Sequence, residues 1–149
     1  MRELLSKVNS WRMWVLCDRP PIKNWSKGRI TLLGDAAHPM LQYLAQGAGM
    51  AIEDAVCLAN QIEAANGDYP AAFSRYQDLR YLRTARVQIM AKVYGEIYHA
   101  NAVVRELRNK LLREWAGQGG IDMSWLYGEQ PELPQVRSVP QPTTTRLVS

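Results

Sequence analysis

The chain has 149 residues, of which 47% are hydrophobic and 21% are charged, and its formal net charge at pH 7 is +4. These values are those of an ordinary soluble domain, and the basic residues between positions 75 and 113 are more typical of a solvated helix face than of a nucleic-acid site. The two cysteines lack metal-ligand spacing, and no apolar run is long enough for a signal or a bilayer span. We therefore expect no metal, no membrane span and a cytoplasmic protein with reduced thiols.

The first thirty residues predict a short helix followed by a strand. Residues 2–10 have a helical spacing of apolar side chains, and residues 11–16 alternate as a strand does. Pro20 and Pro21 end that strand because proline donates no ladder hydrogen bond, and residues 23–28 form a connecting turn.

The most informative stretch is residues 30–39. Residues 30–33 are branched and apolar and are closed by Gly34, which predicts a short strand buried on both faces. Asp35 follows directly, and Gly47-Ala48-Gly49 then opens a helix. This order leaves an acidic side chain at the carboxyl end of a strand and free N–H groups at a helix start, and both are devices for holding a polar cofactor.

Two helical patterns fill most of the remaining chain. The first runs from about residue 46 to 65 and is stopped by the turn residues at 66–68, with Glu53 and Asp54 placed to complement the helix dipole. The second runs from Pro70 to about residue 115.

The second pattern is too long for one helix of a globular domain. We expect a break near Gly95 or between residues 98 and 101. Beyond a glycine-rich stretch at 117–120, the chain keeps one apolar patch at 125–127 and then becomes a proline- and threonine-rich tail, which we expect to be largely disordered.

Four sequence words resemble those of the single-component flavin-dependent aromatic hydroxylases, most closely the 3-hydroxybenzoate 6-hydroxylase and salicylate hydroxylase branch. The words are WSKGR at 25–29, GDAAHP at 34–39, LAQGAGM at 44–50 and EDA at 53–55. The family's Gly-x-Gly-x-x-Gly motif is absent, as is nearly all of its substrate-binding sheet. Ala45 stands where the family usually has glycine, a replacement shared with the 3-hydroxybenzoate branch.

The resemblance implies an α/β fold class. The chain would be an incomplete fragment of an FAD-binding domain of the Rossmann-like, p-hydroxybenzoate hydroxylase type, mainly helical by content. Residues 1–28 would end the substrate domain and return the chain to the flavin domain. Residues 29–116 would be the C-terminal part of the FAD-binding domain, and residues 117–149 the extended tail.

By the same resemblance, one group of residues binds FAD. Asp35 accepts hydrogen bonds from the ribityl hydroxyls, and the N–H groups of the helix start stabilise the reduced isoalloxazine. The alternatives are a helix or turn cap for Asp35 and a merely tight turn at the glycines. The full set of cofactor-binding candidates is Gly34, Asp35, Ala36, Pro39, Gly47, Ala48, Gly49 and Met50.

Gln46 is the candidate catalytic residue, because an uncharged amide can orient a phenol or a carboxylate without repelling it. Its alternative role is an N-terminal helix cap. We expect His38 to hydrogen-bond neighbouring backbone and fix the loop rather than to transfer a proton, and Pro39 to lie beside the flavin ring with its carbonyl facing the substrate pocket. Met40 and Tyr43 would line the pocket or belong to the core.

The implied activity is hydroxylation of a phenolic or benzoate-type substrate, such as 3-hydroxybenzoate or salicylate, by dioxygen. FAD is the cofactor and NADH, or NADPH, the co-substrate, and homodimers are common in the family. The alternative is an inactive truncated fragment that acts as a helical interaction module. Taken alone, the chain is expected to self-associate and to lose FAD, because a strand without its sheet exposes backbone edges and apolar surface.

Overall fold

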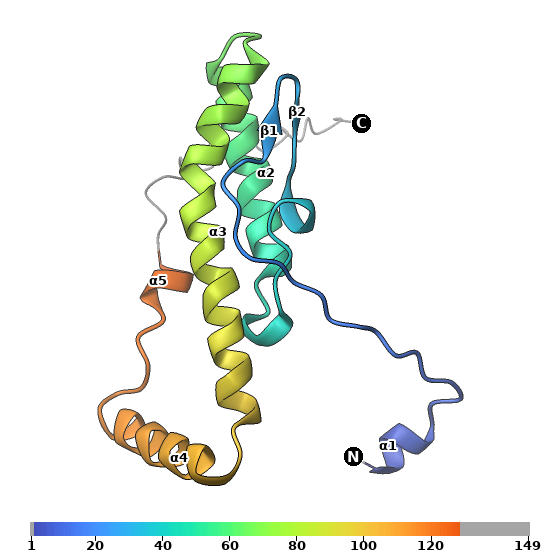
Figure 1. Cartoon of the computed structure of the whole chain (residues 1–149), viewed down its shortest axis with the longest axis vertical. Helices are drawn as coiled ribbons and strands as arrows, with labels where there is room; N and C mark the ends of the chain where they lie inside the picture. Colours follow the sequence, from blue (N-terminus) through green and yellow to red (C-terminus); the bar gives the residue numbers. More distant parts are fainter. Residues whose placement is uncertain (1, 129–149) are drawn as a thin grey trace, which may run out of the picture.

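Two long helices, α2 (Gly47–Ala64) and α3 (Tyr69–His99), lie side by side at the centre of the computed structural model, which describes residues 2–128 (Figure 1). The other elements are shorter and surround this pair. They are α1 (Arg2–Ser6), β1 (Ser26–Lys27), β2 (Ile30–Thr31), the 3-10 helices η1 (Gly34–Ala36) and η2 (Gln42–Leu44), α4 (Ala102–Gly117) and α5 (Ser124–Tyr127). The described part of the chain is therefore mainly helical, as expected.

The ends of α2 and α3 follow from their capping residues. The helix α2 stops before Asn66 and Gly67, which both take positive φ angles that an α-helix does not allow. Asp68 then accepts a hydrogen bond of 3.1 Å from the Ala71 N–H and so caps α3, with Pro70 in its first turn. Both predicted helices and the stop between them are confirmed.

The expected break in the long helical pattern occurs between α3 and α4. The helix α3 ends at His99, Ala100 and Asn101 are extended, and Ala102 has a φ of +44°. The helix α4 then turns away from α3 (Figure 1). The predicted break between residues 98 and 101 is confirmed, whereas α3 runs unbroken through Gly95.

The strand predicted to be buried on both faces is instead half of a small exposed hairpin. β2 pairs antiparallel with β1, with Ser26 opposite Thr31 and Lys27 opposite Ile30, and Gly28 makes the turn with a φ of +58°. Ile30 is 71% exposed. The prediction was wrong on burial because residues 2–128 provide this strand with a neighbour on one edge only.

The strand predicted at residues 11–16 is also wrong. These residues have no regular structure, and they belong to a segment that extends away from the helices (Figure 1). Their alternating pattern does not produce a strand because no other described segment pairs with them. The short helix predicted before them is confirmed as α1, although it ends at Ser6 rather than at residue 10.

Two apolar clusters hold the fold together. The first lies between the hairpin and the helix pair and is formed by Trp25, Ala37, Cys57 and Tyr76. The second joins α2, α3, η2 and α5 and is formed by Leu44, Met50, Val87, Ala91 and Leu126. Cys57 is fully buried in the first of these clusters.

The chain after α4 returns to the side of α3 through α5 (Figure 1). Arg83 donates to the carbonyls of Trp125 and Leu126 at 3.0 and 3.1 Å, so the predicted apolar patch at 125–127 is docked on the helix pair. The expected disorder of residues 129–149 lies outside the described residues. Within residues 2–128, no helix has the length and apolar character that a bilayer crossing requires.

Candidate functional site

The loop of residues 34–39 is pressed against the first turns of α2. Gly34 has a φ of +58°, and a Cβ atom on it would lie 3.1 Å from the Cβ of Ala51. Both the left-handed backbone and the close approach therefore require glycine at this position. This contact sets Asp35, the next residue, beside the start of α2.

The Asp35 carboxylate faces the N-terminal end of α2. Its Oδ1 would lie 3.8 Å from a Cβ placed on Gly47, and Asp35 itself is exposed. No residue in the described range 2–128 donates a hydrogen bond to this carboxylate, and it caps neither η1 nor α2. Asp35 thus presents an acceptor, without a protein partner, next to the positive end of a helix dipole.

The first turn of α2 presents backbone donors on the same side. The N–H groups of Gly47, Ala48 and Gly49 precede the first intrahelical hydrogen bond, as at any helix start, and no side chain caps them. Met50 differs, because its N–H donates to the Gln46 carbonyl at 2.9 Å and its side chain is fully buried in the core. The structure therefore brings Asp35 and three of the predicted helix-start residues together but leaves the Met50 side chain away from them.

Gln46 occupies the N-cap position of α2 without acting as a cap. Its Nε2 donates to the Leu44 carbonyl at 3.3 Å, and its Oε1 would lie 3.2 Å from a Cβ on Gly49. Ala45, just before it, has a left-handed φ of +53°, which a glycine would adopt with less strain. The amide is half-buried and lies across the first turn of the helix.

The backbone carbonyls of the loop are bound by side chains from outside it. Arg19 donates to the carbonyls of Ala36 and Ala37, the latter at 3.2 Å. Gln88, from the middle of α3, donates to the Pro39 carbonyl at 3.0 Å. The predicted residues Ala36 and Pro39 therefore belong to one loop, and the carbonyls of both accept hydrogen bonds from side chains outside it.

A buried cluster of charges lies behind the loop. Asp54 accepts from the Gly34 N–H at 3.1 Å, from Arg80 Nε at 2.8 Å and from His38 Nε2 at 2.5 Å. Arg80 Nη1 also lies 2.7 Å from Glu53 Oε2, a charge contact whose angle does not suit a hydrogen bond. His38 does fix the loop, but through a side chain of α2 rather than through neighbouring backbone.

The ionisation of the cluster follows from these contacts. Burial alone would raise the pKa of Asp54, but the hydrogen bonds from His38 and Arg80 outweigh it and hold the pKa of Asp54 below its ordinary value. For Glu53, burial is likewise outweighed by Arg83 and Arg80, so that its pKa is also lowered. Both carboxylates are therefore charged at neutral pH.

Sequence reasoning missed the role of Asp54 and Arg80. Asp54 was expected to complement the dipole of α2, yet it lies in the second turn and is fully buried. A signal was present, because Asp54 lies between the apolar core residues Met50 and Cys57 at helical spacing. A charged residue within an apolar face usually has a buried partner.

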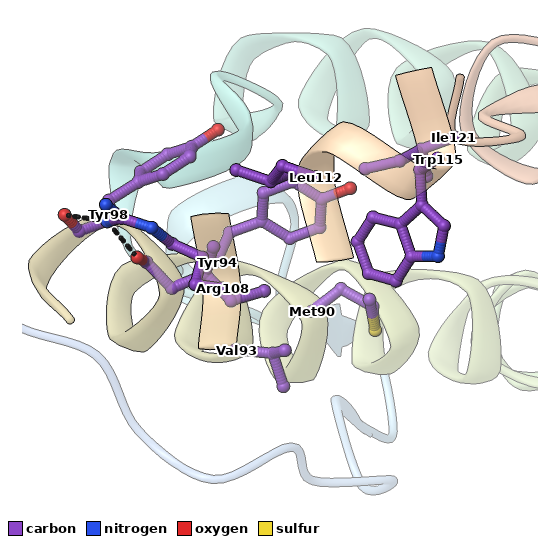
Figure 2. Close-up of a pocket in the computed structure, with 9 residues that line it drawn as sticks. Met90, Val93, Tyr94, Tyr98, Arg108, Leu112, Trp115 and Ile121 are labelled. Atoms are coloured by element: carbon purple, nitrogen blue, oxygen red, sulfur yellow. Dashed lines mark hydrogen bonds between the residues drawn. The ribbon is translucent and has the colours of Figure 1, made fainter. Parts of the chain in front are cut away.

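A separate hollow of about 570 Å³ lies between α3 and α4 (Figure 2). Its walls are almost entirely apolar, and the guanidinium of Arg108 at its edge already donates to the carbonyls of Ile97 and Tyr98. No predicted site residue lines it. The residues around it are Met90, Val93, Tyr94, Ile97, Tyr98, Arg108, Leu112, Trp115 and Ile121.

Comparison with known proteins assigns the chain to a family. The model of the FAD binding domain matches residues 3–88, more than half of the chain, and the chain belongs to the FAD-binding domain family. The loop of residues 34–39 and most of α2 and α3 fall within the matched range.

The chain is also similar to individual curated proteins. The chain is 48% identical over 132 residues to 3-hydroxybenzoate 6-hydroxylase 1 of Aquipseudomonas alcaligenes, an alignment that covers 85% of this chain and 32% of that protein. It is 40% identical over 127 residues to 3-amino-4-hydroxybenzoate 2-monooxygenase PtnB3 of Streptomyces platensis, again over 85% of this chain and 32% of the relative. The chain thus spans about a third of the length of these curated relatives.

A solved structure is similar as well. It is Klebsiella pneumoniae HpxO complexed with FAD and uric acid, to which the chain is 31% identical with a TM-score of 0.62. The match covers 68% of this chain and 26% of that one. The likeness to an FAD complex agrees with the family assignment.

Proposed function

We propose that this chain is the C-terminal portion of an NAD(P)H- and FAD-dependent monooxygenase that hydroxylates a phenolic or benzoate-type aromatic substrate. The observation that carries the proposal is the position of the Asp35 carboxylate beside the first N–H groups of α2, where no residue of the range 2–128 donates a hydrogen bond to it. Membership of the FAD-binding domain family and the named activities of the relatives support it.

The chemistry of these groups fits FAD. An exposed carboxylate accepts hydrogen bonds from hydroxyl groups such as those of a ribityl chain. The N–H groups of Gly47, Ala48 and Gly49, at the positive end of a helix, donate to carbonyl oxygens and favour a ring that gains negative charge. FAD would supply the redox chemistry with NAD(P)H and dioxygen, while these residues bind and orient it.

Finer parts of the proposal rest on the resemblance. The complete domain would be Rossmann-like and of the p-hydroxybenzoate hydroxylase type, with residues 1–28 closing the substrate domain and residues 29–116 forming the C-terminal part of the flavin domain. The substrate would be 3-hydroxybenzoate, salicylate or a similar compound, oriented in part by Gln46. NADH as co-substrate, a cytoplasmic location and a homodimer belong to the same proposal.

Replacement of Asp35 tests the proposal. In the full-length protein, Asp35→Asn removes the charge with little change in size, so we expect FAD to dissociate more readily and the flavin content after gel filtration to fall. Asp78→Asn is the matched control, because Asp78 is an exposed carboxylate on α3 whose one ion pair within the described part of the chain is with Lys23, at 3.7 Å. Equal flavin content in wild type and Asp35→Asn would remove Asp35 from the site.

The alternative of a helical interaction module is favoured by one observation. Val103, Val104 and Leu107 on α4 are each more than half exposed, and such apolar faces mark surfaces that partners cover. The exposed apolar surface has the same measurable consequence under either function. Light scattering and flavin absorbance of the isolated 149-residue chain should show self-association without FAD, and a yellow monomer with one FAD per chain would contradict that expectation.

A further inference from the structure

One side chain of α3 ties the candidate flavin loop to the segment that precedes the hairpin. Gln88 is 3% exposed, and its Nε2 donates both to the Pro39 carbonyl at 3.0 Å and to the Arg19 carbonyl at 3.2 Å. A side-chain amide has two N–H donors, so both are used here. The two acceptors are separated by twenty positions in sequence, and both bind this one amide.

Arg19 extends the connection along the loop. Its backbone carbonyl is bound by Gln88, and its guanidinium donates to the carbonyls of Ala36 and Ala37. Three carbonyls of the loop, on both sides of His38, are therefore held by the side chains of Arg19 and Gln88. Asp35 immediately precedes this part of the loop, so the direction of its carboxylate depends on where the loop is held.

We propose that Gln88 is a positioning residue for the flavin site, which holds loop 34–39 directly through Pro39 and indirectly through Arg19 and thereby sets Asp35 against the start of α2. This inference rests on the proposed function. It adds Gln88 to the candidate flavin site. Gln88 carries no charge, has no hydrogen bond to Asp35 within residues 2–128, and lies on α3, from which no cofactor-binding candidate comes. Its removal should loosen the loop without disturbing the charge cluster around Asp54, which does not contact Gln88 through any hydrogen bond in residues 2–128.

The test compares Gln88→Met with Thr84→Val in the full-length protein. Thr84 is a matched control one turn earlier on α3, because it is fully buried and its hydroxyl, among residues 2–128, bonds only to the Arg80 and Tyr81 carbonyls of its own helix. Both variants remove a buried polar group, but only Gln88→Met releases the loop. We expect FAD to bind about tenfold more weakly to Gln88→Met than to Thr84→Val, as the loss of a buried hydrogen bond would give.

Two further measurements separate positioning from general instability. The N–H groups of Ala37 and His38, which donate to the Gly34 carbonyl, should exchange with solvent faster in Gln88→Met, without FAD present, than in Thr84→Val. The visible absorption band of the bound flavin should also shift in Gln88→Met alone. If Gln88→Met does not fold, Arg19→Met, at a partly exposed position, should produce the same loop exchange and flavin changes.

The results of these measurements bear separately on the role of Gln88 and on the proposed function. Equal FAD affinity in the two variants, with or without faster loop exchange, overturns the role of Gln88 and leaves the flavin site in place. Wild-type protein that binds no FAD overturns the proposed function and this inference with it. Weaker FAD binding, faster loop exchange and a shifted flavin band in Gln88→Met, with wild-type behaviour in Thr84→Val, support both.

Discussion

His38 Nε2 lies 2.5 Å from Asp54 Oδ2, and both side chains are almost completely buried. This contact joins the loop of residues 34–39 to the second turn of α2, and the same carboxylate binds Arg80 of α3. Three segments that are far apart in sequence are therefore fixed by one acidic side chain. The candidate flavin site depends on this arrangement, because Gly34 and Asp35 begin the loop that it holds.

Loss of the Arg80 cation should be strongly destabilising. Arg80→Met keeps most of the side-chain volume but leaves Asp54 and Glu53 buried or half-buried without their shared partner. Breaking a buried ion pair in this way costs about 3–5 kcal/mol. The free energy of unfolding in urea measures the effect.

The control for this change is Arg75→Met on the exposed side of the same helix, which should change stability by no more than about 0.5 kcal/mol. A similar small effect for Arg80→Met would show that the buried cluster contributes little to stability.

Acid should destabilise the protein through the same carboxylates. The pKa values of Asp54 and Glu53 are lowered in the folded state, so the unfolded chain binds more protons than the folded one as the pH falls below their ordinary values of 3.8 and 4.5. The stability that they contribute is thus present in full above about pH 5 and is lost towards lower pH.

Urea unfolding at a series of pH values between 7 and 3 tests this sign. In Glu53→Gln, the free energy of unfolding should fall less steeply with decreasing pH, since one of the two carboxyl groups no longer titrates. A free energy of unfolding that stays constant down to pH 3 would contradict the assignment.

Gly34 should tolerate no side chain. Gly34→Ala places a methyl group 3.1 Å from the Cβ of Ala51 on a backbone with a φ of +58°. Gly28→Ala is a matched control, because Gly28 has the same φ with nothing within 4 Å of the added Cβ. We expect Gly28→Ala to cost about 1 kcal/mol from the backbone alone and Gly34→Ala at least about 2 kcal/mol. Equal costs in thermal unfolding would mean that α2 moves aside freely.

Gly95 should be equally sensitive for a different reason. Its φ is helical, but an added Cβ would lie 2.5 Å from the ring of Tyr43, which packs edge-on against Tyr98 and His99. Gly95→Ala should therefore cost about 1–3 kcal/mol, whereas Gly117→Ala, with open space around it, should not destabilise α4. Adding Tyr43→Ala to Gly95→Ala should cost less than the sum of the two single changes, and strict additivity would show that the ring is not what the methyl group meets.

Local signals in the sequence were sufficient to predict the helices. The turn at residues 66–68 separates α2 from α3, and the length of the second pattern predicted a break, with Gly95 and residues 98–101 as the two candidate positions, of which the second is observed. The strands could not be predicted in the same way, because burial of a strand depends on partners that its own residues do not specify. Residues 30–33 have the composition of a central strand, yet Ile30 and Thr31 pair only with the hairpin strand β1 among the described residues.

The site was predictable only in part for a related reason. Asp35 and the start of α2 are close in sequence, and two neighbouring sequence words, at 34–39 and 44–50, carried them. The partners that hold them are distant, since Arg80 lies 26 residues after Asp54 and Gln88 lies 49 residues after Pro39. No periodicity within one segment records such pairs. The signal that the sequence does contain is a polar residue on an apolar helix face, as at Asp54 and Gln88, because such a residue usually has a buried hydrogen-bonding partner.

The cluster around Arg80 also constrains how relatives of this protein can diverge. An ancestor that lost Arg80 first would leave Asp54 and Glu53 without the buried cation that they share, and one that lost Asp54 first would leave the buried Arg80 with Glu53 as its remaining carboxylate. Either intermediate would be selected against, so positions 53, 54 and 80 should be replaced together or not at all. Inherited variation at these three positions should therefore be correlated across lineages, even where the surrounding surface drifts freely.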